Sequence, residues 1–208
     1  EVVGDELRRR EGADFTKKAS YSVRVRSTDN SGRYIEKSFL ISLVFNGGTF
    51  SYDFDDSIPS GATIYGDARI ETTTGYGGTA GLVLTRNQPN QMSSLIIEDV
   101  NPGLTLTGFS LTYKQRIAAT SSSNYADGVS ISLASDIPDA AISEAGAGTG
   151  LRVNFVTYQY SSPGRRIDVY YDGVLHARSM TNPFTNGEFL DVAITVDRGG
   201  WFNLNYGG

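Results

Sequence analysis

Two pairs of acidic residues come closest to the arrangement that cleaves a glycosidic bond, namely Asp53 with Asp55 and Glu188 with Asp191. Such cleavage needs two carboxyl groups that flank the bond as nucleophile and general acid. Glu188 and Asp191 are three residues apart, so they would point to opposite faces of a strand. Asp53 and Asp55 would share a face, but residues 52–56 are more typical of a strand that runs into a turn. Neither pair predicts a glycosidase.

Nucleophilic and metal-dependent chemistry finds even less support. The chain has one histidine, His176, and no cysteine, which excludes disulfides, thiol nucleophiles, thiolate metal sites and any site with two imidazoles. A Gly-x-Ser-x-Gly elbow is also absent, so a catalytic triad has no nucleophile. We therefore expect a protein that is not an enzyme, with His176 at the surface or half-buried.

The charge balance restricts the partners. The 208 residues include 18 Lys or Arg and 23 Asp or Glu, which leaves a net charge of −5. Binding of nucleic acid needs a basic face to neutralise phosphates, so this balance argues against that partner. No run of 18 apolar residues occurs, which argues against insertion into a membrane.

The elements that must position any site are strands. Apolar residues alternate with polar ones, which is typical of strands with one buried face; this alternation covers residues 21–25, 109–113, 129–133, 167–171, 192–196 and 202–206. Gly and Asn mark the turns between them, and Asp172-Gly173 predicts the sharpest hairpin. Residues 136–145 allow one short turn of helix. The pattern predicts an all-β sandwich or barrel.

Charge also divides the chain. Residues 1–44 carry nine basic and seven acidic residues, whereas residues 45–208 carry nine and sixteen. The first segment is too short to bury a core alone. We therefore predict a boundary between residues 44 and 45, with an incomplete first domain. On this interpretation the chain is a segment of a larger protein.

The first segment resembles the closing strands of a bacterial cadherin-like repeat, an Ig-like β-sandwich, on residues 14–15, 21–32 and 36–43. The resemblance implies that Asp29 contributes to calcium between successive repeats. Other acidic positions of that family are replaced here, by Thr16 and by residues 43–46. Calcium needs six to eight oxygen ligands, and few remain. Asp29 therefore either contributes to calcium at this end or forms an Asx-type turn.

The second segment contains Ala-Asp-Gly at residues 126–128, a glycine-rich loop at residues 146–150 and Arg-Ile-Asp-Val at residues 166–169. This order resembles the concanavalin A-like lectin and glucanase superfamily, in its L-type lectin branch and the related modules of large bacterial surface proteins. The resemblance spans residues 54–206 and implies a jelly-roll sandwich, incomplete at its C-terminal end.

The same resemblance implies a sugar site at Asp127, Gly146 and Gly148. A carboxylate can accept two sugar hydroxyls, and the backbone N–H groups of a glycine loop can approach a ligand closely. Tyr158 and Tyr160 would share one face of a sheet and form an aromatic strip for stacking on sugar rings. Asp127 has an alternative role as a turn-capping residue.

The metal site of plant lectins does not carry over. Its acidic ligands correspond to Asn154 and Val156, and its histidine falls near Gly164. A single Asn carbonyl does not replace two carboxylates for a hard cation. We therefore expect no lectin-type metal pair at this position, so that a sugar would be held without it or elsewhere on the sheet.

These observations favour a non-catalytic carbohydrate-binding or adhesion module, extracellular or at the cell surface, with neighbouring domains in the same polypeptide. The alternatives are a structural spacer that binds nothing and a degraded glycoside hydrolase. Trp201 follows Gly199-Gly200 and could stack on a sugar, but burial tendencies favour a core position for this residue.

Overall fold

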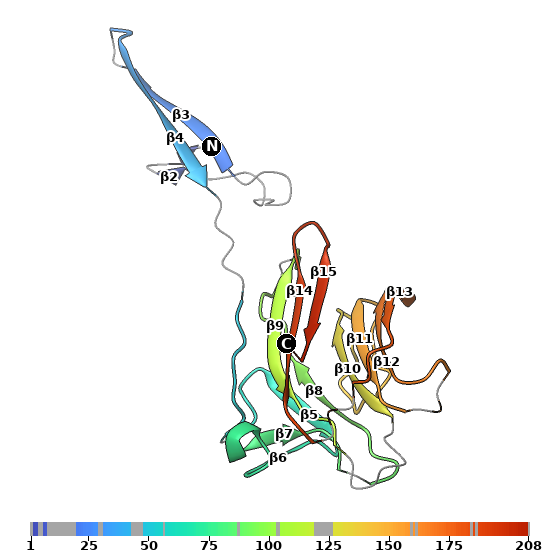
Figure 1. The fold of residues 1–208 in the computed structure, drawn as a ribbon. Helices are drawn as coiled ribbons and strands as arrows, with labels where there is room; N and C mark the ends of the chain where they lie inside the picture. The colour runs from blue at the N-terminus through green and yellow to red at the C-terminus, as the bar shows by residue number, and fades with distance from the viewer. Residues whose placement is uncertain are drawn as a thin grey trace. The chain divides into compact units, whose positions relative to one another are not determined.

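The computed structural model describes residues 2–3, 6–7, 20–28, 31–42, 48–55, 57–86, 88–102, 105–118, 127–158, 160, 162–183, 185 and 187–207. The chain forms two compact units, Glu1–Thr49 and Phe50–Gly208, and most of their strands are labelled in Figure 1. The charge distribution places the boundary slightly earlier, between residues 44 and 45.

The first unit contains two antiparallel strand pairs. They are β1 (Val2–Val3) with β2 (Glu6–Leu7), and β3 (Ser20–Thr28) with β4 (Tyr34–Ser42). In the longer pair Ser20 lies opposite Ser42 and Thr28 opposite Tyr34, so every residue of the two strands is paired. Asp29, the predicted calcium residue, lies outside the described residues.

The second unit is built from antiparallel sheets (Figure 1). The largest has the order β10-β11-β12-β13, with bounds Gly128–Leu133, Leu151–Val156, Arg166–Tyr171 and Val174–Ser179. A second has the order β15-β14-β9, with bounds Phe202–Tyr206, Leu190–Val196 and Phe109–Gln115. The smaller elements are β5 (Ala62–Gly66) paired with β8 (Ser93–Ile97), β6 (Arg69–Glu71) paired with β7 (Gly81–Val83), and the 3₁₀ turn η1 (Tyr76–Gly78).

The described residues contain no α-helix, so the prediction of an all-β chain is confirmed. In the same residues no helix has the length and apolar character needed to cross a membrane.

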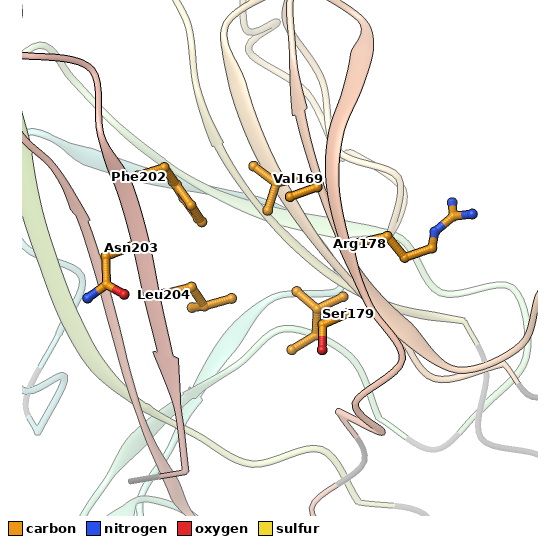
Figure 2. Close-up of a pocket in the computed structure, with 8 residues that line it drawn as sticks. Val169, Arg178, Ser179, Phe202, Asn203 and Leu204 are labelled. Carbon is orange, nitrogen blue, oxygen red and sulfur yellow. The ribbon is translucent and has the colours of Figure 1, made fainter.

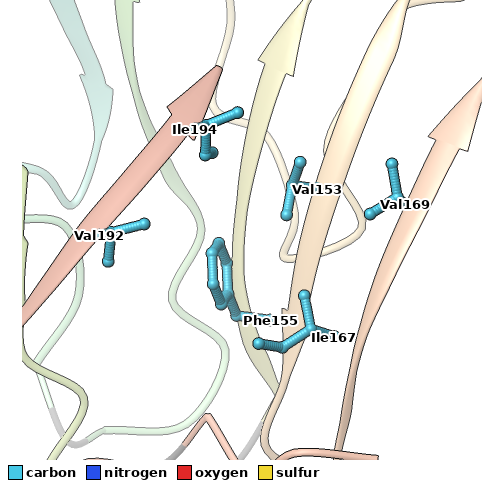
Figure 3. Close-up of a cluster of buried hydrophobic side chains, with 6 residues drawn as sticks. All are labelled: Val153, Phe155, Ile167, Val169, Val192 and Ile194. Carbon is cyan, nitrogen blue, oxygen red and sulfur yellow. The ribbon is translucent and has the colours of Figure 1, made fainter. Parts of the chain in front are cut away.

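The four-stranded and three-stranded sheets share one hydrophobic core, to which both contribute their inner faces (Figure 3). Its buried members are Val153, Phe155, Ile167, Val169, Val192 and Ile194. The Phe155 ring also lies 5.4 Å from the ring of Tyr206 on β15. Since successive side chains of a strand point to opposite faces, the alternating apolar residues of the sequence fill this core. Two sheets joined by their inner faces are the arrangement of a β-sandwich.

The predicted hairpin at Asp172-Gly173 is confirmed. It joins β12 to β13, and Tyr171 lies opposite Val174 across the two-residue turn. Both turn residues have positive φ, 50° at Asp172 and 72° at Gly173. Such a turn matches the twist of the flanking strands and favours Asp-Gly.

The prediction that residues 136–145 allow a helical turn was wrong, because these residues form turns and bends. The Asp136 carboxylate accepts the N–H of Thr149 at 2.8 and 3.2 Å, and this hydrogen bond lowers the pKa of Asp136. An aspartate that bonds to nearby backbone offers the chain an alternative to a helix. Its side chain thereby fixes the loop that leads into β11.

Candidate functional site

A polar row crosses the outer face of the four-stranded sheet, because Ser130, Asn154, Asp168 and Arg178 lie opposite one another on successive strands. Asp168 is only 1% exposed. It accepts hydrogen bonds from Arg178 Nε and Nη2 at 2.6 and 2.9 Å, and from Arg166 Nε at 2.7 Å. Burial raises the pKa of Asp168, but the hydrogen bonds from Arg178 and Arg166 outweigh it and leave the pKa below its ordinary value. Both carboxylate oxygens are therefore occupied by guanidinium groups.

The residues at the positions of the lectin metal ligands have other roles. Asn154 Nδ2 donates to the Ala145 carbonyl at 3.2 Å, and the Gly164 carbonyl accepts a hydrogen bond from Arg166 at 2.6 Å. Val156 supplies no side-chain oxygen. Nowhere in the described ranges do three or more His, Asp or Glu residues gather as a metal site would require. The side chains at these positions do not form the oxygen-rich set that calcium needs.

The glycine loop packs onto the outer face of β10. A Cβ built at Gly146 would lie 2.7 Å from the Oγ atoms of Ser130 and Ser132, and one at Gly148 would lie 2.6 Å from the Cβ of Ala134. The N–H of Ala147 donates to Ser132 Oγ at 3.3 Å. Only a residue without a side chain allows the loop to come this close.

We expect Gly146→Ala to destabilise the chain more than Gly173→Ala, by about 1 kcal/mol. Both glycines have a φ of 72°, so both substitutions carry the same left-handed backbone strain of roughly 1–2 kcal/mol. Only at Gly146 does the new methyl group collide with Ser130 and Ser132 and endanger the hydrogen bond from Ala147. Urea denaturation of the two variants measures the difference. Equal losses would contradict the close packing of this loop.

Asp127, Tyr158 and Tyr160 come together at one end of the four-stranded sheet. The carbonyl of Asp127 accepts the N–H of Thr157 at 3.0 Å, which places Asp127 beside the residue that precedes Tyr158. The rings of Tyr158 and Tyr160 meet edge to face, with centroids 5.7 Å apart. Tyr158 is 37% exposed and Tyr160 is 71% exposed. The backbone of the exposed Asp127 thus lies next to the segment that carries two exposed aromatic rings; we name Asp127, Tyr158 and Tyr160 the tyrosine cluster.

The prediction that Tyr158 and Tyr160 share one face of a sheet was wrong. β11 ends at Val156, so the two tyrosines lie in the connection to β12 and do not occupy one face of a strand. Thr157 is buried, and its carbonyl accepts a hydrogen bond from Arg165 Nε at 3.0 Å. This bond ties the two ends of the connection together.

Gly146 and Gly148 lie away from the tyrosine cluster. Gly148 contacts Ala134, which follows the end of β10, whereas Asp127 precedes its start. Asp127 and Ala134 are seven positions apart along an extended segment, or roughly 23 Å. Gly146 lies between them, over Ser130 and Ser132. The structure therefore brings together three of the five predicted ligand residues, and the glycine loop forms a separate feature of the same strand.

Trp201 is a candidate whose exposure the sequence interpretation missed. Its predicted core position was wrong, since the side chain is 79% exposed at the tip of the β14–β15 hairpin. The carboxylate of Asp197 accepts the N–H groups of Gly199 and Trp201 at 2.8 and 3.0 Å, which orders the turn. The signal was the two glycines directly before Trp201, because a tight turn carries its neighbours to the surface.

The residues considered for acid–base chemistry are dispersed. Asp53 accepts the N–H of Asp55 at 3.2 Å, an Asx-type turn at the surface. His176 is exposed on β13, and its ring lies 6.3 Å from that of Tyr171. These contacts are those of turn and surface residues.

No protein-family model matches the chain, and comparison with curated proteins finds no match to its sequence.

Proposed function

We propose that this chain is a non-catalytic carbohydrate-binding or adhesion module, and that the tyrosine cluster binds the sugar. The observation that carries the proposal is the hydrogen bond from the Thr157 N–H to the Asp127 carbonyl, which brings the Asp127 backbone to the segment that carries two exposed tyrosine rings, with centroids 5.7 Å apart. Aromatic faces stack on the apolar faces of sugar rings, and a carboxylate accepts hydrogen bonds from sugar hydroxyls.

The proposal includes the absence of catalytic activity. A glycosidase needs two carboxyl groups free to exchange protons or attack carbon. Asp168, the most buried carboxylate among the residues that the structure describes, is occupied by Arg166 and Arg178, and its lowered pKa keeps it charged. A carboxylate held in this way supports the sheet and is a poor proton donor.

The proposal extends to architecture and location. We propose a concanavalin A-like jelly roll for the second unit and the closing strands of a cadherin-like repeat for the first, with Asp29 as a calcium contributor. Such a chain would act outside the cell or at its surface, beside further domains of the same polypeptide. Both resemblances rest on sequence motifs and their order.

Glycan-array binding of the full 208-residue chain tests the sugar site. We expect Asp127→Ala and Tyr160→Ala each to weaken binding by about tenfold or more, because each removes one of the interactions that would hold the sugar. Tyr171→Ala is the matched control. Tyr171 is also an exposed tyrosine, but it lies at the C-terminal end of β12, whereas the connection that carries Tyr160 enters β12 at its N-terminal end. It should bind like the unsubstituted chain.

Binding that persists in both variants would contradict the site. A chain that binds no glycan on the array would support the spacer alternative, and release of sugar from a β-glucan would support the hydrolase alternative.

A further inference from the structure

The outer face of the three-stranded sheet is a surface of short polar side chains. Its members are Ser110, Thr112, Lys114, Asp191, Ala193, Thr195, Asn203 and Asn205; we name them the outer face. Thr112, Ala193 and Asn205 lie opposite one another in one row, as do Ser110, Thr195 and Asn203 in the next. Residues 112–114 and 191–193 line a hollow of about 420 Å³. The side chain of Ala193 is shorter than the polar side chains on either side of it, so the middle of the outer face is a depression.

An aromatic ring from a separate element lies beside this hollow. Lys114 Nζ lies 4.2 Å from the ring centre of Tyr76, in η1. Tyr76 is 58% exposed, and Phe189 meets it edge to face at 5.8 Å. Thr79 Oγ1 donates to the Tyr76 carbonyl at 3.1 Å and orders the turn that carries it. The ring is therefore held in place while much of it remains open to solvent.

The charges that line the hollow cancel. Lys114 Nζ and Asp191 Oδ1 are 2.7 Å apart, and the hydrogen bond from Lys114 to Asp191 raises the pKa of Lys114. Arg116, farther along the chain, has its guanidinium 4.9 Å from the Phe189 ring centre. The remaining polar groups of the outer face are hydroxyls and amides. Such a surface complements an uncharged ligand rich in hydroxyl groups.

We infer that the outer face, together with Tyr76, is a second ligand site, which takes a neutral oligosaccharide or polysaccharide chain. Asn205 and Thr112 offer hydrogen bonds to hydroxyls, Ala193 gives an apolar floor, and Tyr76 gives a ring for stacking. A protein partner would need large apolar or aromatic anchors at the centre, where Ala193 lies. A nucleic acid or an acidic glycan would need excess positive charge, which the Lys114–Asp191 pair does not supply.

This site is distinct from the tyrosine cluster, because it lies on the other sheet and shares no residue with it. It shares with the proposed function only the class of ligand. The two sites can therefore be tested separately on the same chain.

Affinity electrophoresis of the full chain in native gels tests the inference, with xyloglucan, galactomannan and hydroxyethyl cellulose as neutral probes and polygalacturonate as the charged one. We expect retardation by at least one neutral polysaccharide. Tyr76→Ala should weaken it roughly tenfold, as loss of a stacked ring does. Ala193→Trp should block the hollow, and Asn205→Ala, which adds no bulk, should weaken binding without disturbing the fold. Tyr171→Ala should leave retardation unchanged.

The outcomes separate the two sites. If Asp127→Ala abolishes binding while Tyr76→Ala, Ala193→Trp and Asn205→Ala bind normally, the inference is wrong and the tyrosine cluster is the site. If instead Tyr76→Ala, Ala193→Trp and Asn205→Ala weaken binding while Asp127→Ala binds normally, the result supports a sugar site on the outer face and contradicts one at the tyrosine cluster. A chain retarded by none of the neutral polysaccharides, or more strongly by polygalacturonate, overturns the inference. Amide shifts of Thr112, Ala193 and Asn205 in NMR spectra with the retarding polysaccharide's oligosaccharide should confirm the contact directly, and unmoved amides would contradict it.

Discussion

Replacing Asp168 with alanine should lower the free energy of unfolding by about 3 kcal/mol at neutral pH, the lower end of the range for breaking a buried ion pair. Asp168 is 1% exposed and holds both Arg166 and Arg178. Without it, Arg166 and Arg178 lose the carboxylate to which both donate hydrogen bonds. We take the lower end because the Arg178 side chain is one-third exposed, at 33%, so water compensates it in part. Urea denaturation followed by far-UV circular dichroism measures the loss.

The pH dependence of this effect has a definite sign. The pKa of Asp168 is lower in the folded chain than its ordinary value, so the folded state favours the charged form. The resulting stability is fully present above the ordinary carboxylate pKa of about 3.9, and is lost as the pH falls through the folded value. The difference between the unsubstituted chain and Asp168→Asn should therefore be constant near neutrality and shrink below about pH 4.

The control for this prediction is Asp191→Asn. Asp191 also pairs with a cation, Lys114, at 2.7 Å, but its side chain is 74% exposed. Exposed pairs contribute little to stability. If Asp168→Ala and Asp191→Asn had equally small effects, the buried row on the four-stranded sheet would not be a stabilising network.

Replacing Phe155 with alanine should cost about 3–5 kcal/mol. Phe155 is fully buried in the shared core (Figure 3), and its ring lies 5.4 Å from that of Tyr206 on the opposite sheet. Alanine would remove the contact with Tyr206 and leave a cavity that rigid strands cannot close. Chemical denaturation gives the loss of unfolding free energy.

Trp201→Ala is the matched aromatic substitution. Its side chain lies at the surface, so we expect a change within about 0.5 kcal/mol. A loss at Trp201 that equals the loss at Phe155 would contradict the division between core and surface in the second unit.

The core is less tightly packed at one side of the sandwich, where the edge strands of the two sheets face each other. β13 and β15 are the last strands of their sheets, and a hollow of about 250 Å³ lies between them, lined by residues that include Val169, Phe202 and Leu204 (Figure 2). Phe155 is not one of the residues that line this hollow.

The strands and the core could be predicted from the sequence because alternation of apolar residues is a local signal. Ile167, Val169 and Val192 each occupy the inner face that their spacing indicates. The Asp172-Gly173 turn was equally local, since only a few residue types adopt positive φ at two successive positions. Pairing between distant strands, by contrast, leaves no trace in a single sequence.

The candidate sites could be predicted only in part for the same reason. The tyrosine cluster depends on where β11 ends, and the alternation around Val156 does not mark that point. The outer face depends on Tyr76, which is separated from Lys114 in the sequence by two strands, β7 and β8, that belong to different sheets. The ion pairs of Asp168 join three positions, of which Arg178 becomes a neighbour only because β13 folds back on β12.

The exposed position of Trp201 has a practical consequence for spectroscopy. It is the only tryptophan of the chain, and an indole already surrounded by water emits at long wavelength before any denaturant is added. Its fluorescence should therefore change little when the sheets come apart. The same property makes it a clean reporter at the β14–β15 tip, where a blue shift on addition of a molecule would signal that the indole has been covered.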